Sequence, residues 1–378
     1  MKGSLQRILM TADTVGGVWP YALELAGAMA VYDIEIILAT MGNRLSGSQW
    51  EEVRKLKNVK VRQSTFKLEW MSDPWQDIED AGDWLLELEN EFEPDLIHLN
   101  GYAHVNLPWH APKLVVGHSC VLSWWRAVKG KDAPAEYERY ENVVRAGLRA
   151  ADYVVAPTRA MMRSLIENYG PFENASVIPN GRALEKYGPG RKENFVLSAG
   201  RLWDEAKNVR AVCACSLELP WLIRVAGDVD HPDGGSEEVT SQTAEQRTKW
   251  LGKLSEAQMA DWFGRASIYA LPAKYEPFGL SILEAALSGC ALVLGDIPSL
   301  RENWNGAALF VDPNDIRQIR TLLLELIENP SQRTALATRA RERGRQFNIT
   351  ETASFYWRAY QSLSEMDRIA EERSLAVI

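Results

Sequence analysis

The chain has 378 residues, 46% of them hydrophobic, so it is long enough for two or three domains with separate cores. Its 42 basic and 51 acidic residues leave a net charge of −9, which excludes an overall field that recruits nucleic acid or anionic lipid. No apolar run in the sequence is long enough to span a bilayer, so we expect no integral membrane segment.

The cysteines carry no spacing typical of a zinc or redox site. They are Cys120, Cys213, Cys215 and Cys290, and no signal peptide opens the sequence. We therefore expect reduced thiols and a cytoplasmic protein.

Short apolar runs rich in strand-forming residues alternate with helical patterns along the chain. In order, the expected strands are Arg7 to Thr11, Ile34 to Thr40, Asp95 to Asn100, Leu114 to Ser119, Tyr153 to Pro157, Phe195 to Gly200, Trp221 to Gly227, Ile268 to Ala273 and Ala291 to Asp296. This alternation is typical of an α/β fold with doubly wound parallel sheets.

A polar stretch rich in Gly, Pro and Lys, Asn180 to Asn194, interrupts the alternation near the middle of the chain. We interpret it as the hinge between two sheets. A polar loop is expected from Asp230 to Thr243, and the last helix, Glu351 to Arg373, is expected to cross back to the first domain. The predicted divisions are 1–185, 186–350 and 351–378.

The most informative segment runs from Lys274 to Ala286, where Glu276-Pro277-Phe278-Gly279 precedes an apolar, helix-forming run containing Glu284. A helix that begins near Gly279 would offer free backbone amides and the positive end of its dipole to a diphosphate. Carboxylates beside an anion need another partner, and sugar hydroxyls suit them because an ionised carboxylate accepts two at once. The segment predicts a nucleotide-sugar site.

Two further turns follow expected strands. Gly16 and Gly17 lie where the backbone can closely approach a ligand, although plain turn chemistry explains two adjacent glycines equally well. The Gly-x-Gly-x-x-Gly spacing of a nicotinamide-dependent oxidoreductase is absent.

In the second half, Arg201 follows an expected strand and Lys207 precedes a helix, so both cations could reach a phosphate pair at the sheet's switch point. The alternative is that they pair with Asp204 and Glu205 on the surface.

Taken together and in order, these pieces resemble the retaining glycosyltransferases of family four. The pieces are Gly16-Gly17, Gly200-Arg201-Leu202 with Lys207, and Glu276-Pro277-Phe278-Gly279 with Glu284, supported by Ala151 to Thr158, Val177 to Gly181 and Pro298 to Glu302. The resemblance covers nearly the whole chain. It implies the B-type glycosyltransferase fold, in which two Rossmann-like domains face one another.

The resemblance also implies roles for individual residues. Arg201 and Lys207 would bind the donor diphosphate, Glu284 the ribose hydroxyls and Glu276 the hydroxyls of the transferred sugar. The remaining implied contacts to the donor are made by Gly16, Gly17, His118, Leu251, Gly252, Leu254, Phe278, Gly279 and Leu280. Glu276, His118, Arg201 and Lys207 are the implied catalytic residues, although a lone His at a strand end is often structural.

An acceptor site is suggested by Trp124, Trp125 and Arg126, because paired indoles beside a cation can stack on a sugar. Packing of a loop against a helix explains these residues nearly as well. The expected acceptor is a soluble sugar, glycan or glycoside.

The expected reaction is transfer of a sugar from a nucleotide-diphosphate sugar, most commonly a uridine diphosphate sugar, with retention and without cofactor or metal. Asp228-Val229-Asp230 resembles a metal motif of another glycosyltransferase architecture, but it follows a strand deep in the second half. The alternatives are a nucleotide-sugar 2-epimerase, a disaccharide phosphorylase or a noncatalytic nucleotide-sugar binding protein.

Overall fold

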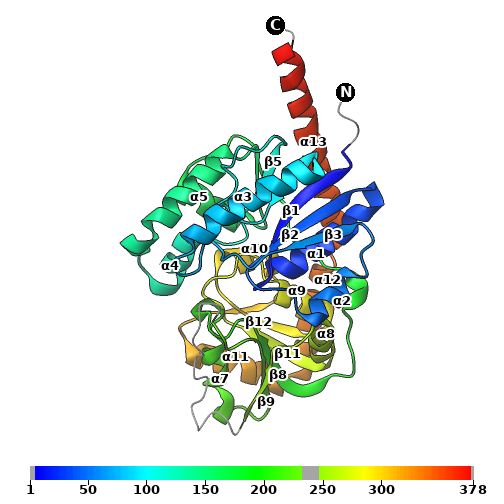
Figure 1. The fold of residues 1–378 in the computed structure, drawn as a ribbon. Coiled ribbons are helices and arrows are strands. Elements are labelled where there is room, and N and C mark those ends of the chain that lie inside the picture. Colours follow the sequence, from blue (N-terminus) through cyan, green and yellow to red (C-terminus); the bar gives the residue numbers. More distant parts are fainter. Residues whose placement is uncertain (1–4, 232–246, 376–378) are drawn as a thin grey trace. The chain divides into compact units, whose positions relative to one another are not determined.

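The computed structural model describes residues 5–231 and 247–375, with side chains to residue 365, and it divides into two compact units (Figure 1). Unit 1 comprises Met1–Ser123, Asp132–Gly181 and Ile349–Ile378, and unit 2 comprises Trp124–Lys131 and Arg182–Asn348. The segment Trp124–Lys131, which sequence reasoning places in the first domain, is thus grouped with unit 2. The loop expected from Asp230 to Thr243 lies largely outside the described residues.

Unit 1 contains a seven-stranded sheet in the order β3-β2-β1-β4-β5-β6-β7, with every pair parallel. Its strands are β1 (Arg7–Asp13), β2 (Glu35–Met41), β3 (Val59–Gln63), β4 (Leu96–Leu99), β5 (Lys113–Val116), β6 (Tyr153–Ala156) and β7 (Ala175–Val177). The helices between them are α1 (Val18–Ala28), η1 (Met29–Tyr32), α2 (Gly47–Val53), α3 (Trp75–Phe92), η2 (Ala135–Tyr137), α5 (Glu138–Ala150) and α6 (Arg159–Tyr169). Helix α4 (Val121–Lys129) also follows β5, but its residues from Trp124 on are grouped with unit 2.

Unit 2 contains a six-stranded parallel sheet in the order β10-β9-β8-β11-β12-β13. Its strands are β8 (Glu193–Ala199), β9 (Leu222–Ala226), β10 (Thr248–Gly252), β11 (Ala266–Leu271), β12 (Ala291–Gly295) and β13 (Leu309–Val311). Its helices are η3 (Leu184–Lys186), η4 (Glu205–Lys207), α7 (Val209–Cys213), η5 (Ser216–Glu218), α8 (Glu256–Arg265), α9 (Leu280–Leu287), α10 (Pro298–Trp304), α11 (Ile316–Glu328) and α12 (Pro330–Gly344).

All nine strands expected from the sequence are present, and their ends agree within two residues except at β5, which ends at Val116 and not at Ser119. Four further strands, β3, β7, β10 and β13, were not predicted from the sequence. They are the edge strands of the two sheets. A central parallel strand is buried on both faces and reads as a continuous apolar run, whereas an edge strand such as Val59–Gln63 carries polar residues and keeps no buried position.

The order of the strands reverses once in each sheet. This switch point lies between β1 and β4 in unit 1 and between β8 and β11 in unit 2. In open parallel sheets, ligands bind beyond the carboxyl ends of the strands at such points. Of the candidate site residues, Gly16, Gly17, Arg201, Lys207 and Glu276 lie in segments that follow these strands, whereas His118 follows β5, and Leu251 and Gly252 end β10.

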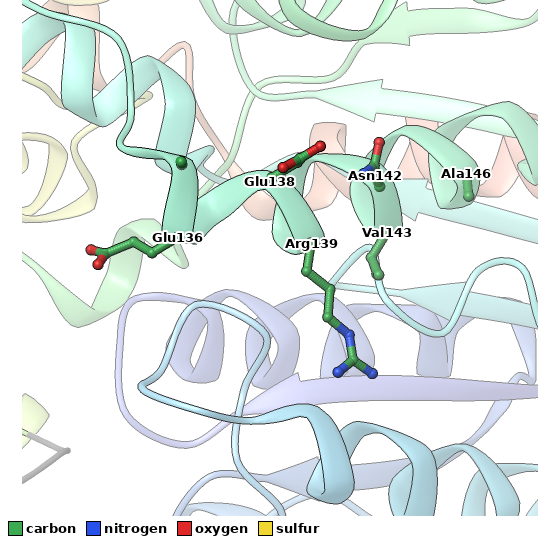
Figure 2. Close-up of a pocket in the computed structure, with 7 residues that line it drawn as sticks. Glu136, Glu138, Arg139, Asn142, Val143 and Ala146 are labelled. Atoms are coloured by element: carbon green, nitrogen blue, oxygen red, sulfur yellow. The ribbon is translucent and has the colours of Figure 1, made fainter.

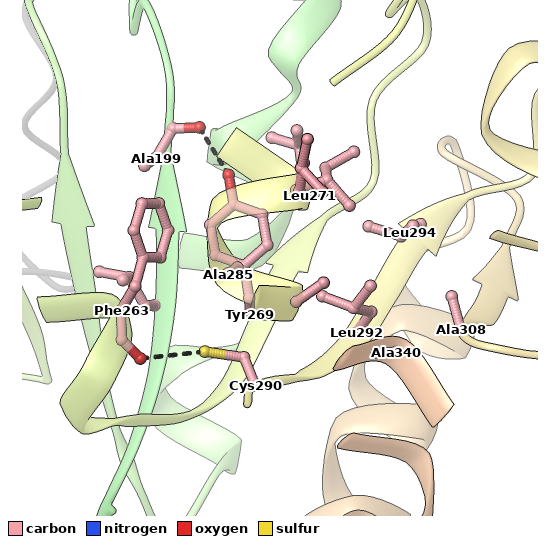
Figure 3. Packing of buried hydrophobic residues seen from close by; sticks show 14 of the residues in the cluster. Ala199, Phe263, Tyr269, Leu271, Ala285, Cys290, Leu292, Leu294, Ala308 and Ala340 are labelled. Atoms are coloured by element: carbon pink, nitrogen blue, oxygen red, sulfur yellow. Dashed lines mark hydrogen bonds between the residues drawn. The ribbon is translucent and has the colours of Figure 1, made fainter. Parts of the chain in front are cut away.

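The core of unit 2 lies between its sheet and helices α8, α9 and α12 (Figure 3). Two buried polar groups within it are satisfied by main-chain oxygens: the Tyr269 hydroxyl donates to Ala199 O at 3.1 Å, and Cys290 Sγ donates to Phe263 O at 3.2 Å. Lys192 Nζ donates to Ser288 O at 2.7 Å and Ala266 O at 2.8 Å, so one ammonium joins α8, α9 and the strands beside them.

The last helix, α13 (Ile349–Leu375), belongs to unit 1, as the sequence predicted for Glu351 to Arg373. Tyr356 and Tyr360 are fully buried there, and the Tyr21 hydroxyl of α1 donates to the Tyr356 hydroxyl at 2.6 Å. The C-terminal helix thus packs in the same unit as the N-terminal part of the chain. Over the described residues, no helix is both long and apolar enough to cross a membrane.

Candidate functional site

The two predicted phosphate ligands of unit 2 lie in the segment that follows β8. Gly200 extends the β8–β9 pairing by donating its N–H to Ala226 O at 3.1 Å, and Arg201 comes next. Asn208, with φ of 53°, donates from its side chain to Pro272 O at 2.9 Å, beyond the end of β11. This amide ties the segment carrying Lys207 to the segment carrying Glu276.

Lys207 and Glu276 form an ion pair, with Nζ 2.6 Å from Oε2, and their side chains are only 15% and 12% exposed. The sequence alternative, in which Lys207 pairs with Asp204 or Glu205, is wrong for this residue. Glu205 instead accepts a hydrogen bond from Lys129 at 2.5 Å. One shielded cation and one shielded carboxylate therefore meet at the switch point of unit 2.

For Arg201 the alternative expected from the sequence, an ion pair with a neighbouring acid, is partly confirmed. Its guanidinium contacts Asp204 Oδ2 at 2.8 Å, and its side chain is 35% exposed. Burial alone would raise the pKa of Asp204, but the charges of Arg201 and Lys207 outweigh burial and lower it, with help from the Trp124 indole N–H. That indole donates to Asp204 Oδ1 at 3.0 Å within unit 2. Asp204 thus holds Arg201 in place while leaving much of the guanidinium accessible.

The turn that contains Glu276 is held by a hydrogen bond from α10 and ends at the start of α9. Ser299 Oγ donates to Glu276 O at 2.5 Å, and the Phe278 ring is buried in the core. Gly279 has φ of 92°, a conformation that other residues rarely adopt, and it precedes the first residue of α9. The helix therefore begins where the sequence predicted, directly after Gly279, and the first backbone amides of a helix have no partner within it.

Glu284 lies in the second turn of α9, is buried and forms an ion pair with buried Arg182. Sequence reasoning missed Arg182. These two residues are 102 positions apart, and the only signal was a basic residue directly after Asn180-Gly181. Both acids of the predicted site therefore have a cation of their own, which reduces their repulsion of a bound diphosphate.

The predicted base contacts lie at the far edge of the same sheet. Leu251 and Gly252 end β10, and Gly252, with φ of 68°, accepts at its carbonyl a hydrogen bond of 3.0 Å from the Gly227 N–H. Leu251 and Leu254 pack against the core cluster that contains Phe278. Their role as base contacts stays a prediction.

In unit 1, Gly16 and Gly17 follow β1 and lead into α1. Gly17 caps α1 with φ of −68°, so its backbone conformation does not require glycine. The turn is held by Asp13, whose carboxylate accepts from Val15 N at 2.5 Å. Close approach of a ligand at these glycines remains a prediction.

His118 lies after β5, partly exposed, with its ring edge against Tyr21 at 4.5 Å between centroids. Its Nε2 is 2.7 Å from Asn100 Oδ1, at the end of β4. Burial, reinforced by the nearby His98, lowers the pKa of His118 to about 3. The imidazole is therefore neutral at any physiological pH and suits hydrogen bonding better than charge stabilisation.

The predicted acceptor residues lie on α4. Trp124 and Trp125 meet edge to face at 5.8 Å between ring centroids, Lys131 lies over Trp125 at 5.6 Å, and Arg126 is exposed. The indole N–H of Trp124 donates to Asp204, and Lys129 Nζ lies over its ring at 5.7 Å from the centroid, so both the polar and the aromatic part of this side chain already make contacts. Their role as acceptor contacts stays a prediction.

An open hollow of about 580 Å³ lies on η2 and α5 of unit 1 (Figure 2). Glu136, Glu138, Arg139 and Asn142 line it, and it contains no residue predicted for the donor or acceptor. Arg139 is engaged by the Trp75 ring at 4.4 Å and Glu79 at 3.2 Å. This hollow carries none of the expected chemistry.

Family models match both units. The model described as glycosyl transferase 4-like domain matches residues 16–181, and the model described as glycosyl transferases group 1 matches residues 181–343. Among solved structures, sucrose-phosphate synthase from Thermosynechococcus elongatus superposes with a TM-score of 0.79 at 18% identity, over 95% of this chain and 99% of its own. HepE of Anabaena in complex with UDP and glucose superposes with a TM-score of 0.73 at 16% identity, over 94% and 100%.

The two parallel sheets, each with its switch point, thus form the B-type glycosyltransferase fold. The chain belongs to glycosyltransferase family four.

Curated relatives are similarly distant. D-inositol 3-phosphate glycosyltransferase of Kineococcus radiotolerans is 26% identical over 94% of this chain and 92% of its own length. O-antigen chain mannosyltransferase B of Escherichia coli is 26% identical over 59% of this chain and 58% of its length. The names of these two relatives differ in the acceptor, so the comparison identifies a sugar transferase without its acceptor.

Proposed function

We propose that this glycosyltransferase moves a sugar from a nucleotide-diphosphate sugar, first of all a uridine diphosphate sugar, to a hydroxyl of a sugar, glycan or glycoside. We further propose that it retains the anomeric configuration and needs no metal. The observation that carries the proposal is the shielded Lys207–Glu276 pair of unit 2, which joins the segment that contains Arg201 to the segment that leads into α9.

The diphosphate would be bound by Arg201, Lys207 and the amides of Phe278, Gly279 and Leu280. The guanidinium of Arg201, the ammonium of Lys207 and the N-terminus of α9 supply the positive charge that a departing diphosphate requires. Because these groups belong to the chain, stabilising the leaving group does not depend on a divalent cation.

The two acids would bind hydroxyls on either side of the diphosphate. Glu276 would accept from the transferred sugar and Glu284 from the ribose, each while keeping its own cation, Lys207 or Arg182. A carboxylate has about four acceptor sites, so one ion pair leaves room for hydroxyls. From unit 1, His118 would contact the transferred sugar.

The proposed transfer exchanges one bond at the anomeric carbon for another. The bond from that carbon to the diphosphate oxygen breaks, the acceptor oxygen bonds on the same face, and the departing phosphate oxygen takes the acceptor's proton. Glu276, held by Lys207 and by Ser299 at its carbonyl, orients the sugar and is not a covalent nucleophile.

The proposal is tested by measuring Tm in a panel of nucleoside diphosphates and their sugars, each with and without EDTA. A ligand at 100 times its Kd stabilises by about 2.7 kcal/mol, which is a rise of a few degrees for a protein of this size. We expect uridine diphosphate and its sugars to raise Tm equally with and without EDTA. A panel in which no nucleotide raises Tm would refute the proposed donor.

Products then separate the remaining candidates. Incubation of the bound sugar nucleotide with simple sugar acceptors should give a glycoside with retained configuration. Conversion without an acceptor would indicate a 2-epimerase, dependence on inorganic phosphate a phosphorylase, and binding without any conversion a noncatalytic protein.

A further inference from the structure

A partly buried polar network in unit 1 connects His118 to β1, β4 and α13. Asn100 Oδ1, which follows β4, lies 2.7 Å from Nε2 of His118 and 3.2 Å from Nε2 of His98. His98 is completely buried, and its Nδ1 lies 2.6 Å from the Tyr360 hydroxyl of α13. One amide oxygen thus faces two imidazoles.

The orientation of the Asn100 amide is decided by the main chain of β1. Its Nδ2 lies 2.7 Å from Thr11 O, and its backbone N–H donates to Thr11 Oγ1 at 2.9 Å. A carbonyl oxygen only accepts, so the amide nitrogen must face Thr11 and the amide oxygen must face the two rings. The opposite orientation would place two acceptors 2.7 Å apart.

This orientation fixes the tautomers of both histidines. An amide oxygen has two lone pairs and no proton, so Nε2 of His98 and Nε2 of His118 must each carry hydrogen. His98 then has its lone pair on Nδ1, which accepts from the Tyr360 hydroxyl. Burial raises the pKa of Tyr360 well above its usual value, so this phenol keeps its proton.

We infer that Asn100 is a positioning residue that holds His118 as the neutral Nε2–H tautomer and thereby leaves Nδ1 as a hydrogen-bond acceptor. His118 could then receive a hydrogen bond from a hydroxyl but could not donate from Nδ1 to an oxygen without a hydrogen. The inference extends the proposed function, in which His118 contacts the transferred sugar, by stating which direction that hydrogen bond takes.

Two features of the network favour a neutral ring. The groups beside His118 are the Tyr21 ring of α1 and His98 of β4, and His98 in turn packs against Tyr356 and Tyr360 of α13; none of these is a carboxylate that would stabilise an imidazolium. Burial also lowers the pKa of His98 to about 4. Both rings are therefore neutral over the same pH range, and the hydrogen bond to Asn100 favours the Nε2–H tautomer of His118.

The tautomer can be measured in the unliganded protein by nitrogen NMR of 15N-labelled histidine. The chain has five histidines, and His118→Gln assigns the signal of His118 by its loss. We expect one protonated nitrogen at Nε2 and one unprotonated nitrogen at Nδ1. In Asn100→Ala the two nitrogens of His118 should move toward a common averaged position. A protonated Nδ1 in the natural protein, or an unchanged spectrum in Asn100→Ala, would overturn the inference.

Tyr360→Phe is the matched control, because it removes a hydrogen bond from the same network but leaves the contact between Asn100 and His118. Its His118 signals should stay as in the natural protein. Asn100→Ser is the second variant, because its short side chain also removes the amide oxygen from between the two rings, and it should give the same averaging of the His118 nitrogens. If Asn100→Ala does not fold, Asn100→Ser decides: His118 signals like those of the natural protein would refute a direct role of the Asn100 side chain.

Calorimetry with uridine diphosphate and with uridine diphosphate glucose links the tautomer to the sugar. Loss of one hydrogen bond should weaken binding of the sugar nucleotide on the order of tenfold in Asn100→Ala, with little change for the bare nucleotide. Equal weakening for both ligands would refute the sugar contact. Absence of binding to the natural protein would count against the proposed donor, while the NMR spectra would still decide the role of Asn100.

Discussion

Lys207 Nζ lies 2.6 Å from Glu276 Oε2, and the two residues follow neighbouring strands, β8 and β11, at the switch point of the C-terminal sheet. Each side chain therefore sets the electrostatic surroundings of the other. Without the carboxylate, the ammonium keeps the more distant charge of Asp204 and can pair more fully with a diphosphate, and without the ammonium, the carboxylate would repel that diphosphate.

Glu276→Gln should separate binding from turnover. The amide cannot pair with Lys207 as an ion, so the freed ammonium should bind uridine diphosphate at least as tightly as before. Turnover should fall by about 100-fold, the size of effect seen when one preorganised group at a reacting centre is lost. Calorimetry and a donor-consumption assay measure the two quantities. Glu185→Gln, at an exposed site on η3, is the control, and near-normal turnover at position 276 would remove the proposed role.

Arg201→Ala should weaken binding while leaving stability nearly intact. Only Arg201 is partly exposed, but the buried carboxylate of Asp204 keeps hydrogen bonds from Trp124 and Ala206 and the nearby charge of Lys207, so we expect the loss of Arg201 to cost about 1 kcal/mol. We expect a Tm close to that of the natural protein and an affinity for uridine diphosphate reduced about tenfold. Lys253→Ala, which removes a surface pair with Asp228 of 3.0 Å, should change neither quantity appreciably. A fall in Tm without a change in affinity would identify Arg201 as a structural residue.

Arg182→Met should destabilise the protein strongly, because it leaves the buried carboxylate of Glu284 without its cation. Removing one partner of a buried pair typically costs about 3–5 kcal/mol. The double variant Arg182→Met with Glu284→Gln should recover much of that loss, since no uncompensated charge remains. Urea unfolding followed by circular dichroism measures both. A loss below about 1 kcal/mol in the single variant would show that the pair is not a structural element.

Glu69 should make stability fall as pH rises through neutrality. Its carboxylate accepts from Tyr102 N at 2.9 Å and Ala103 N at 2.6 Å, yet burial raises its pKa to about 7 despite these hydrogen bonds. The folded protein therefore holds a proton that the unfolded chain has already lost. This contribution is complete at low pH and disappears above the folded pKa.

The measurement compares the natural protein with Glu69→Gln in urea at pH 5 and pH 8. Relative to the variant, the natural protein should lose roughly 2–3 kcal/mol of unfolding free energy between these pH values. Parallel pH profiles for the two proteins would contradict the raised pKa of Glu69.

Much of this protein was determined by local sequence. Central strands such as Ile34 to Thr40 and Ala291 to Asp296 can be predicted from the sequence because parallel strands buried on both faces are continuously apolar. The turn at Gly279 and the start of α9 are equally local, since a backbone with φ of 92° selects glycine. From these pieces in order, the fold and the family could be predicted, whereas the roles of the site residues stay predictions.

Tertiary structure alone decided how each charged or polar group is paired. Lys207 has nearby acids in sequence but pairs with Glu276, 69 positions away, and Glu284 pairs with Arg182 across 102 positions. The inferred tautomer of His118 likewise depends on the Thr11 carbonyl, because this carbonyl orients the Asn100 amide that contacts the imidazole. Periodicity encodes which face of an element is buried, whereas the partner of a charge depends on which strand ends the sheet brings together.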